Sequence, residues 1–176
     1  MATTSLNRGN LGVHDLLRAV FNTRSSSATA SFALLAVRIV LAWVFIYYGA
    51  GKLFGAFGGP GIHGTSIYFS DTAHLHPGGL FAVMGGLIEF GGGVAMALGL
   101  CARLAGLALF GDMVMAMITV TWSTGLNSSS PPPGYQLNMA LGVLALVVAL
   151  LGAGQFSLDA VVARRLGIEG SSREQP

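Results

Sequence analysis

The 176-residue sequence has few charges, one cysteine and no histidine in its long apolar runs. Only 9% of its residues are charged, against about 25% in soluble domains. One cysteine excludes an internal disulfide, a CxxC redox pair and a cysteine-held iron–sulfur cluster. A haem inside a bilayer needs axial ligands, usually His, so the sequence predicts no membrane haem. Any electron carrier must therefore diffuse, as a quinone does, or belong to a partner protein. The formal charge of +2 does not indicate a nucleic-acid partner.

Long apolar segments make up most of the chain. The sequence is 53% hydrophobic, and its mean hydropathy is +0.69. Four runs occupy residues 32–52, 79–100, 104–122 and 137–156, with a Gly-rich loop predicted at 53–78. At 1.5 Å per residue, the run 79–100 covers about 33 Å, enough to cross a hydrocarbon core of about 30 Å. We therefore expect an all-α polytopic membrane protein, a bundle of four transmembrane helices in the lipid bilayer.

The apolar runs also define the expected domain organisation. Residues 1–30 form a polar tail, whose pattern fits either a short amphipathic helix or a mostly disordered segment. Residues 31–157 form the transmembrane domain, and residues 158–176 a basic tail. Seven of the nine basic residues fall in the two tails and in the turn 101–103. The positive-inside rule therefore predicts a multi-pass plasma-membrane protein with both termini cytoplasmic.

Glu89, Asp112 and Arg38 are ionisable residues well inside the apolar runs. A charge at that depth costs several kcal/mol unless it is paired, protonated or hydrated, so each is a functional-site hypothesis. Counted at 1.5 Å per residue, the three lie about 10, 13 and 16 Å from the inner helix ends, in the order Arg38, Asp112, Glu89. The sequence thus predicts one buried cluster in which one carboxyl keeps a proton. A proton-exchange site and a purely structural polar network both fit this cluster.

The glycines around Glu89 predict close helix packing. Gly85, Glu89 and Gly93 share one face of the helix, where the missing side chains allow another helix to approach. Lys52 lies at the outer end of the first run, and we expect it to extend toward the interface.

Aromatic residues of the first run are candidates for a ligand pocket. Trp43, Tyr47 and Tyr48 could wall an apolar pocket, and Trp43, Tyr47 and Lys52 are the candidate quinone-binding residues. Asp71, His74 and His76, with His63, are the only candidates for a metal site. Because an H-x-H pair without a second spaced pair is also typical of solvated loops, we expect no metal. Cys101 is expected to be a packing residue.

The runs RIVLAWVFIYYGAGKLFGAFGG and GGLIEFGGGVAMALGLCARLAGLAL, followed by GAGQFSLD, resemble the DoxX family of small four-helix membrane proteins. The resemblance covers about residues 34–160. Asp112 falls where relatives often carry an acid, whereas Gln136 departs from the Glu that many relatives have. The other matching positions are Arg38, Gly49, Lys52, Glu89, Gly92, Gly93, Gly99, Arg103, Gly152, Gly154, Ser157 and Asp159.

The resemblance implies links with membrane oxidoreductase systems. Members of the family are associated with a thiosulfate:quinone oxidoreductase and, in mycobacteria, with a membrane complex containing a superoxide dismutase and a sulfurtransferase. Fold analogy alone does not establish chemistry. The first hypothesis is a membrane subunit of a quinone-linked oxidoreductase, in which Glu89, Asp112 and Arg38 serve proton exchange and the catalytic partners are soluble redox enzymes. The alternatives are a non-catalytic anchor or assembly factor, and a small proton-coupled carrier, which would require a homo-oligomer.

Overall fold

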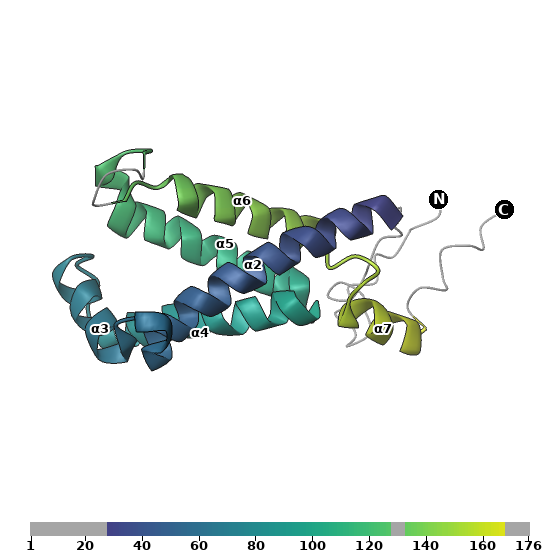
Figure 1. Ribbon diagram of the computed structural model, residues 1–176, viewed down its shortest axis with the longest axis horizontal. Helices are drawn as coiled ribbons and strands as arrows, with labels where there is room; N and C mark the ends of the chain where they lie inside the picture. The colour runs from purple at the N-terminus through teal and green to yellow at the C-terminus, as the bar shows by residue number, and fades with distance from the viewer. Residues whose placement is uncertain (1–27, 128–132, 168–176) are drawn as a thin grey trace, which may run out of the picture.

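The computed structural model describes residues 28–127 and 133–167, and these residues form helices without any β-strand (Figure 1). The main helices are α2 (Ala28–Phe54), α3 (Gly61–Asp71), α4 (Gly78–Leu98), α5 (Ala102–Ala116), α6 (Gln136–Leu151) and α7 (Leu158–Arg165). Short helical turns are η1 (Ala56–Gly58), the π-helical η2 (Met117–Thr121) and η3 (Trp122–Thr124). The amphipathic helix expected in the N-terminal tail falls outside the described residues.

Three helical segments are long and apolar enough to cross a membrane. They are α2, α4 and the stretch Ala102–Thr124, which joins α5 to η2 and η3. The fourth apolar helix, α6, has only 16 residues and is therefore about 24 Å long. It ends before Gly152, whose φ of 86° interrupts the run expected to continue to residue 156. The all-helical membrane fold is confirmed, and a fourth spanning helix stays a prediction.

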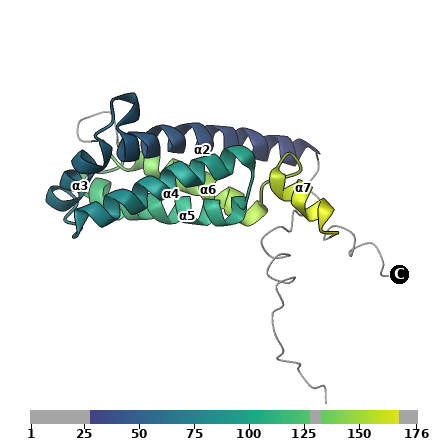
Figure 2. The ribbon, with the colours of Figure 1, turned by 90° about the horizontal axis from the view of Figure 1, so that it is seen from below.

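The long helices lie side by side, with α7 across one end of the bundle (Figure 2). α2 packs along α4, and α5 packs along α6. A Cβ on Gly93 would come within 2.8 Å of the Ile46 backbone nitrogen, and one on Gly49 would overlap the backbone of Phe90. The predicted close approach is confirmed at Gly93. Gly85 does not share it, because it faces Asp112 and Phe69 instead.

The predicted loop at 53–78 contains a helix. α3 begins directly after Pro60, a residue whose fixed φ suits the start of a helix, and it packs against α2 and α4. The frequent glycines and prolines of this segment predicted a loop, but most of them flank the helix, and α3 tolerates Gly61 and Gly64 in its first turn. We call this part of the molecule, with the last turn of α2 and the first turn of α6, the α3 end.

The opposite end, the α7 end, joins segments that are far apart in sequence. The Gln155 N–H donates to the Ser31 hydroxyl at the start of α2. Ser157 caps α7 by accepting the Ala160 N–H at 3.1 Å. Asp159 and Ala163 are buried against the bundle. Residues 158–165 of the expected basic tail are therefore part of the folded domain.

Candidate functional site

A buried ion pair joins α2 to α4 near the α3 end. Lys52 Nζ lies 2.7 Å from Glu89 Oε1. The Glu89 side chain is 4% exposed, whereas that of Lys52 is 26% exposed. Lys52 therefore turns inward to pair with the carboxylate rather than extending to the interface. A charged group with a partner at hydrogen-bond distance avoids most of the penalty of burial in an apolar medium.

Asp112, on α5, adds a second carboxyl to this pair. It lies close enough to Glu89 and Lys52 for the charges of the three groups to interact. Glu89 Oε2 and Asp112 Oδ2 are buried, and neither has a hydrogen-bond partner among the described groups. We call Lys52, Glu89 and Asp112 the acid cluster. Of the three residues that the sequence predicted to cluster, the structure brings Glu89 and Asp112 together.

Arg38 is not part of the acid cluster, which corrects the expected arginine–carboxylate contact. Its guanidinium donates to Met96 O and Ala153 O, both at 2.9 Å, and to the carbonyls of Phe156 and Ala97. Carbonyls at a helix C-terminus have no partner within the helix and carry a partial negative charge. Arg38 thus satisfies its donors on carbonyls of α4 and of residues 153–156, and its side chain points toward the α7 end.

Further charges at the α7 end also bind helix termini. Asp159 Oδ1 and Oδ2 accept the N–H groups of Cys101 and Ala102 at 2.7 and 3.0 Å, which caps α5. Burial raises the pKa of the Asp159 carboxyl, while these bonds and the charge of Arg38 oppose the rise. Burial, followed by the Asp159 charge, also raises the pKa of the Cys101 thiol. Arg103 donates to Ala149 O and Leu150 O at the C-terminus of α6.

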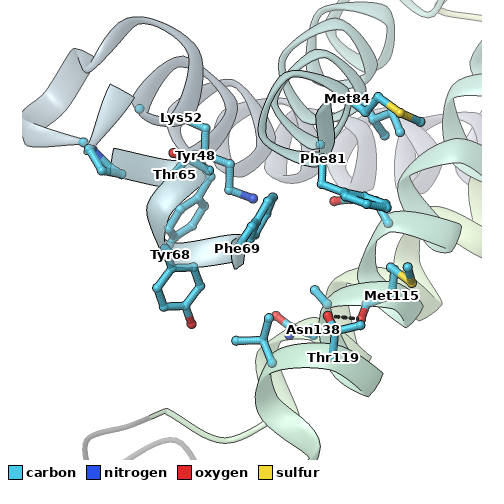
Figure 3. A pocket seen from close by; sticks show the side chains of 18 of the residues that line it. Tyr48, Lys52, Thr65, Tyr68, Phe69, Phe81, Met84, Met115, Thr119 and Asn138 are labelled. Atoms are coloured by element: carbon cyan, nitrogen blue, oxygen red, sulfur yellow. Dashed lines mark hydrogen bonds between the residues drawn. The ribbon is translucent and has the colours of Figure 1, made fainter. Parts of the chain in front are cut away.

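A large apolar cavity adjoins the acid cluster. Its volume is about 1040 Å³, and Lys52 and Asp112 contribute to its wall. Figure 3 shows Tyr68 and Phe69 of α3 on one side, and Thr119 of η2 with Asn138 of α6 on the other. The ammonium group of Lys52 is 5.9 Å from the centre of the Phe69 ring. A cavity with aromatic walls and few polar groups is typical of sites for flat, mainly apolar ligands.

The cavity agrees only partly with the predicted pocket. Tyr47, Tyr48 and Lys52 line it as expected. Trp43 does not line the cavity, and its side chain is 77% exposed on the outside of the bundle. Tyr68 was missed because α3 was predicted to be loop. Asn138 was also missed, although a polar residue near the start of an apolar run was a usable signal.

The predicted metal candidates do not assemble. Within residues 28–127 and 133–167, no three His, Cys, Asp or Glu side chains are grouped closely enough to hold a metal ion. Asp71 lies at the last residue of α3, whereas His74 and His76 follow in the connection to α4. His74 has a φ of 54°, in the left-handed region.

Comparison with known proteins identifies the family. The family model DoxX matches residues 33–122, the segment that carries all three members of the acid cluster. No match was found among curated proteins, and none among solved structures. The match covers half of the chain, and it agrees with the apolar helices of the bundle. This integral membrane protein belongs to the DoxX family.

Proposed function

We propose that the protein is the membrane subunit of a quinone-linked oxidoreductase and that it binds the quinone head group in the cavity beside the acid cluster. The observation that carries the proposal is the position of a buried Lys–Glu–Asp set at the wall of an apolar, aromatic-lined cavity. Such a site offers an apolar ring a place to bind and a group with which it can exchange a proton.

The charges of the acid cluster support a proton-exchanging role. One ammonium and two carboxylates would leave a net negative charge in an apolar site, whereas one added proton makes the cluster neutral. That proton can lie on Glu89 Oε2 or Asp112 Oδ2, the two oxygens without partners. Lys52 holds Glu89 in place through their hydrogen bond. Of the two carboxyl groups, that of Asp112 borders the cavity.

The residues of the cavity fit a quinone head group. Tyr47, Tyr48, Tyr68 and Phe69 supply the aromatic walls, and Asp112 with Lys52 supplies a polar end. A bound quinone accepts electrons together with protons. The chain's part is to bind the ring, to keep bulk water away from it and to hold a proton on the Asp112 or Glu89 carboxyl.

The electrons come from a partner protein in this proposal. The single cysteine is at the α4–α5 turn and does not line the cavity, and the apolar runs contain no histidine. A soluble redox enzyme docked at one membrane surface would supply them. The basic residues Arg103, Arg164 and Arg165 support a cytoplasmic α7 end in the plasma membrane.

Quinone binding can be measured directly with decylubiquinone and the purified protein in lipid nanodiscs, using isothermal titration calorimetry. The wild type should bind. Asp112→Asn and Tyr68→Ala should each weaken binding about tenfold, since each removes about 1.4 kcal/mol of interaction. Trp43→Phe is the matched control, because Trp43 is aromatic but lies outside the cavity. No binding by the wild type above that of empty nanodiscs would refute the proposal.

The alternative function is a non-catalytic anchor for soluble redox enzymes. It is favoured by α7, which presents Arg164 and Arg165 on exposed positions in its last turn. Replacing both arginines with Gln should then abolish co-purification of the partner, while Glu89→Gln should have no effect on it. Turnover with quinone that survives in Glu89→Gln would leave the anchor as the better interpretation.

A further inference from the structure

The buried polar residues of the described chain form two separate groups, one at each end of the bundle. The group toward the α3 end comprises Thr65 of α3, Glu89 in the middle of α4 and Thr121 of η2. The group at the α7 end comprises Ser31, Arg38 and Asp159. The α7-end group is committed to structural hydrogen bonds with backbone groups. It therefore offers the acid cluster no free acceptor or donor.

An apolar layer separates the two groups. Leu41 and Phe45 of α2, Met96 of α4, Leu109 of α5 and Val148 of α6 pack together there, and each is at most 1% exposed. Leu109 lies one turn from Asp112 on the α7 side, about 4.5 Å along the helix, and Met96 lies two turns from Glu89, about 10.5 Å. A close-packed apolar layer excludes water and so carries no protons.

The cavity is the route that remains. Most of its lining lies on the α3 side of the apolar layer, and Leu107 and Ala108 of α5 border it at the level of Leu109. Beyond Asp112, its wall carries the hydroxyls of Thr119 and Thr121 and the amide of Asn138. Asn138 Nδ2 donates to Thr121 Oγ1 at 3.2 Å. The other ionisable groups along the cavity are the phenols of Tyr47, Tyr48 and Tyr68. Thr119, Thr121 and Asn138 lie between the acid cluster and the α3 end, whereas Tyr47 and Tyr48 lie about one turn before Lys52 on α2, between it and the apolar layer.

We propose that Glu89 and Asp112 exchange protons with one membrane surface only, the surface at the α3 end, through the cavity. This inference rests on the proposed proton-exchanging role, and it adds a direction to that role. A single copy of the chain is then not a proton conductor. Each proton that the acid cluster takes up or releases comes from, or returns to, the same side of the membrane.

The sidedness can be tested by carbodiimide labelling under a pH gradient. The wild type is reconstituted in vesicles of phosphatidylethanolamine and phosphatidylglycerol, with its orientation selected through a C-terminal tag. Dicyclohexylcarbodiimide, which crosses the bilayer, is then added while the pH is varied on one side of the membrane and held constant on the other.

The reagent labels only a protonated carboxyl. The proton of the carboxyl passes to a carbodiimide nitrogen while the carboxylate oxygen bonds to the central carbon, and an O-to-N acyl shift gives a stable N-acylurea. Mass spectrometry locates it, with Glu89→Gln and Asp112→Asn as controls for assignment.

The labelling rate should depend on the pH of the solution at the α3 end and should not depend on the pH at the α7 end. The rate falls by up to about tenfold per pH unit once the carboxyl begins to ionise, because only the protonated form reacts. A rate that follows the α7-side pH, or both, would overturn the inference. Absence of pH-dependent labelling on either carboxyl would overturn it together with the proton-exchanging role. One-sided labelling in a protein that fails to bind decylubiquinone would uphold the inference and refute the quinone proposal alone.

A variant of the apolar layer provides an independent test. Leu109→Ser puts a hydroxyl into the layer one turn from Asp112, and it should make labelling respond to pH on both sides. Leu104→Ser is the matched control on the same helix, because Leu104 is 56% exposed and lies outside the layer. Continued response to the α3-side pH shows that each variant is folded. If both variants stay as one-sided as the wild type, the layer is not the barrier.

Discussion

Exposure distinguishes the two members of the buried ion pair. The Glu89 side chain is 4% exposed and lies inside the bundle, whereas that of Lys52 is 26% exposed and has a flexible stem near the end of α2. The loss of one partner therefore has unequal consequences. A lysine left alone can extend toward the interface, but a carboxylate left alone stays buried beside Asp112.

We expect Lys52→Met to destabilise the protein by about 3 kcal/mol and Glu89→Gln by about 1 kcal/mol. The measurement is thermal unfolding of each variant in the same detergent. The double variant should recover most of the stability, since no buried charge of the pair then lacks its partner. A larger loss in Glu89→Gln than in Lys52→Met would contradict this account.

Cys101 should be a poorly reactive thiol. Its pKa is raised, so the thiolate fraction at neutral pH is lower than that of an ordinary cysteine, and only the thiolate reacts. We expect alkylation by iodoacetamide to be at least about tenfold slower than in the unfolded chain, and to accelerate only at higher pH. Mass spectrometry of the alkylated protein measures the rate. Fast alkylation of the folded protein would show that the thiol is activated rather than packed.

The sequence predicted two of the three members of the acid cluster. Glu89 and Asp112 stand out because burying a carboxylate in an apolar run costs free energy, so such a residue is usually functional or paired. Their partner was misassigned, since helix counting gives the depth of Arg38 but not the direction of its side chain. Arg38 turns toward carbonyls of α4 and of residues 153–156, which the sequence does not mark as acceptors. Lys52 was placed at the interface because its rotation toward α4 depends on packing.

α2 and α4 owe their close contact to glycines, which gives a test at two positions. Gly49→Ala places a methyl group against the backbone of Phe90, so the helices must separate, and we expect a loss of about 2 kcal/mol. Gly91→Ala on α4 has no atom within 4 Å and should be neutral or stabilising by up to about 1 kcal/mol. Both are measured by thermal unfolding. Equal effects would mean that Gly49 is not a contact position.

The helices themselves were largely predictable, but their ends were not. The apolar runs placed α2, α4 and the stretch from α5 to η3 within a few residues, because long hydrophobic segments leave few alternatives to a helix. α3 was missed since glycine and proline dominate its flanks. The last helix was predicted too long because hydrophobicity continues to Phe156, whereas Gly152 takes a positive φ and ends α6.

Arg38 of α2 holds together segments at the α7 end of the molecule, because its guanidinium donates to carbonyls of α4 and of residues 153–156. Arg38→Met leaves these carbonyls without partners, and we expect a loss of about 3 kcal/mol in stability. Binding of decylubiquinone below the unfolding temperature should be unchanged, because the cavity is at the opposite end. Arg164→Gln, at an exposed position of α7, is the control. Loss of binding in a well-folded Arg38→Met would restore Arg38 to the site.

The unequal helix lengths have a consequence for the surrounding lipid. α2, with 27 residues, is about 40 Å long and exceeds a hydrocarbon core of about 30 Å, so it tilts or extends its polar first turn into the interface, while α6 reaches only about 24 Å. Hydrophobic mismatch of this kind is relieved when the bilayer thins on the side of the short helix. The protein should therefore be more stable in bilayers with shorter acyl chains. Its α6 face would gather lipids that tolerate a thinner membrane.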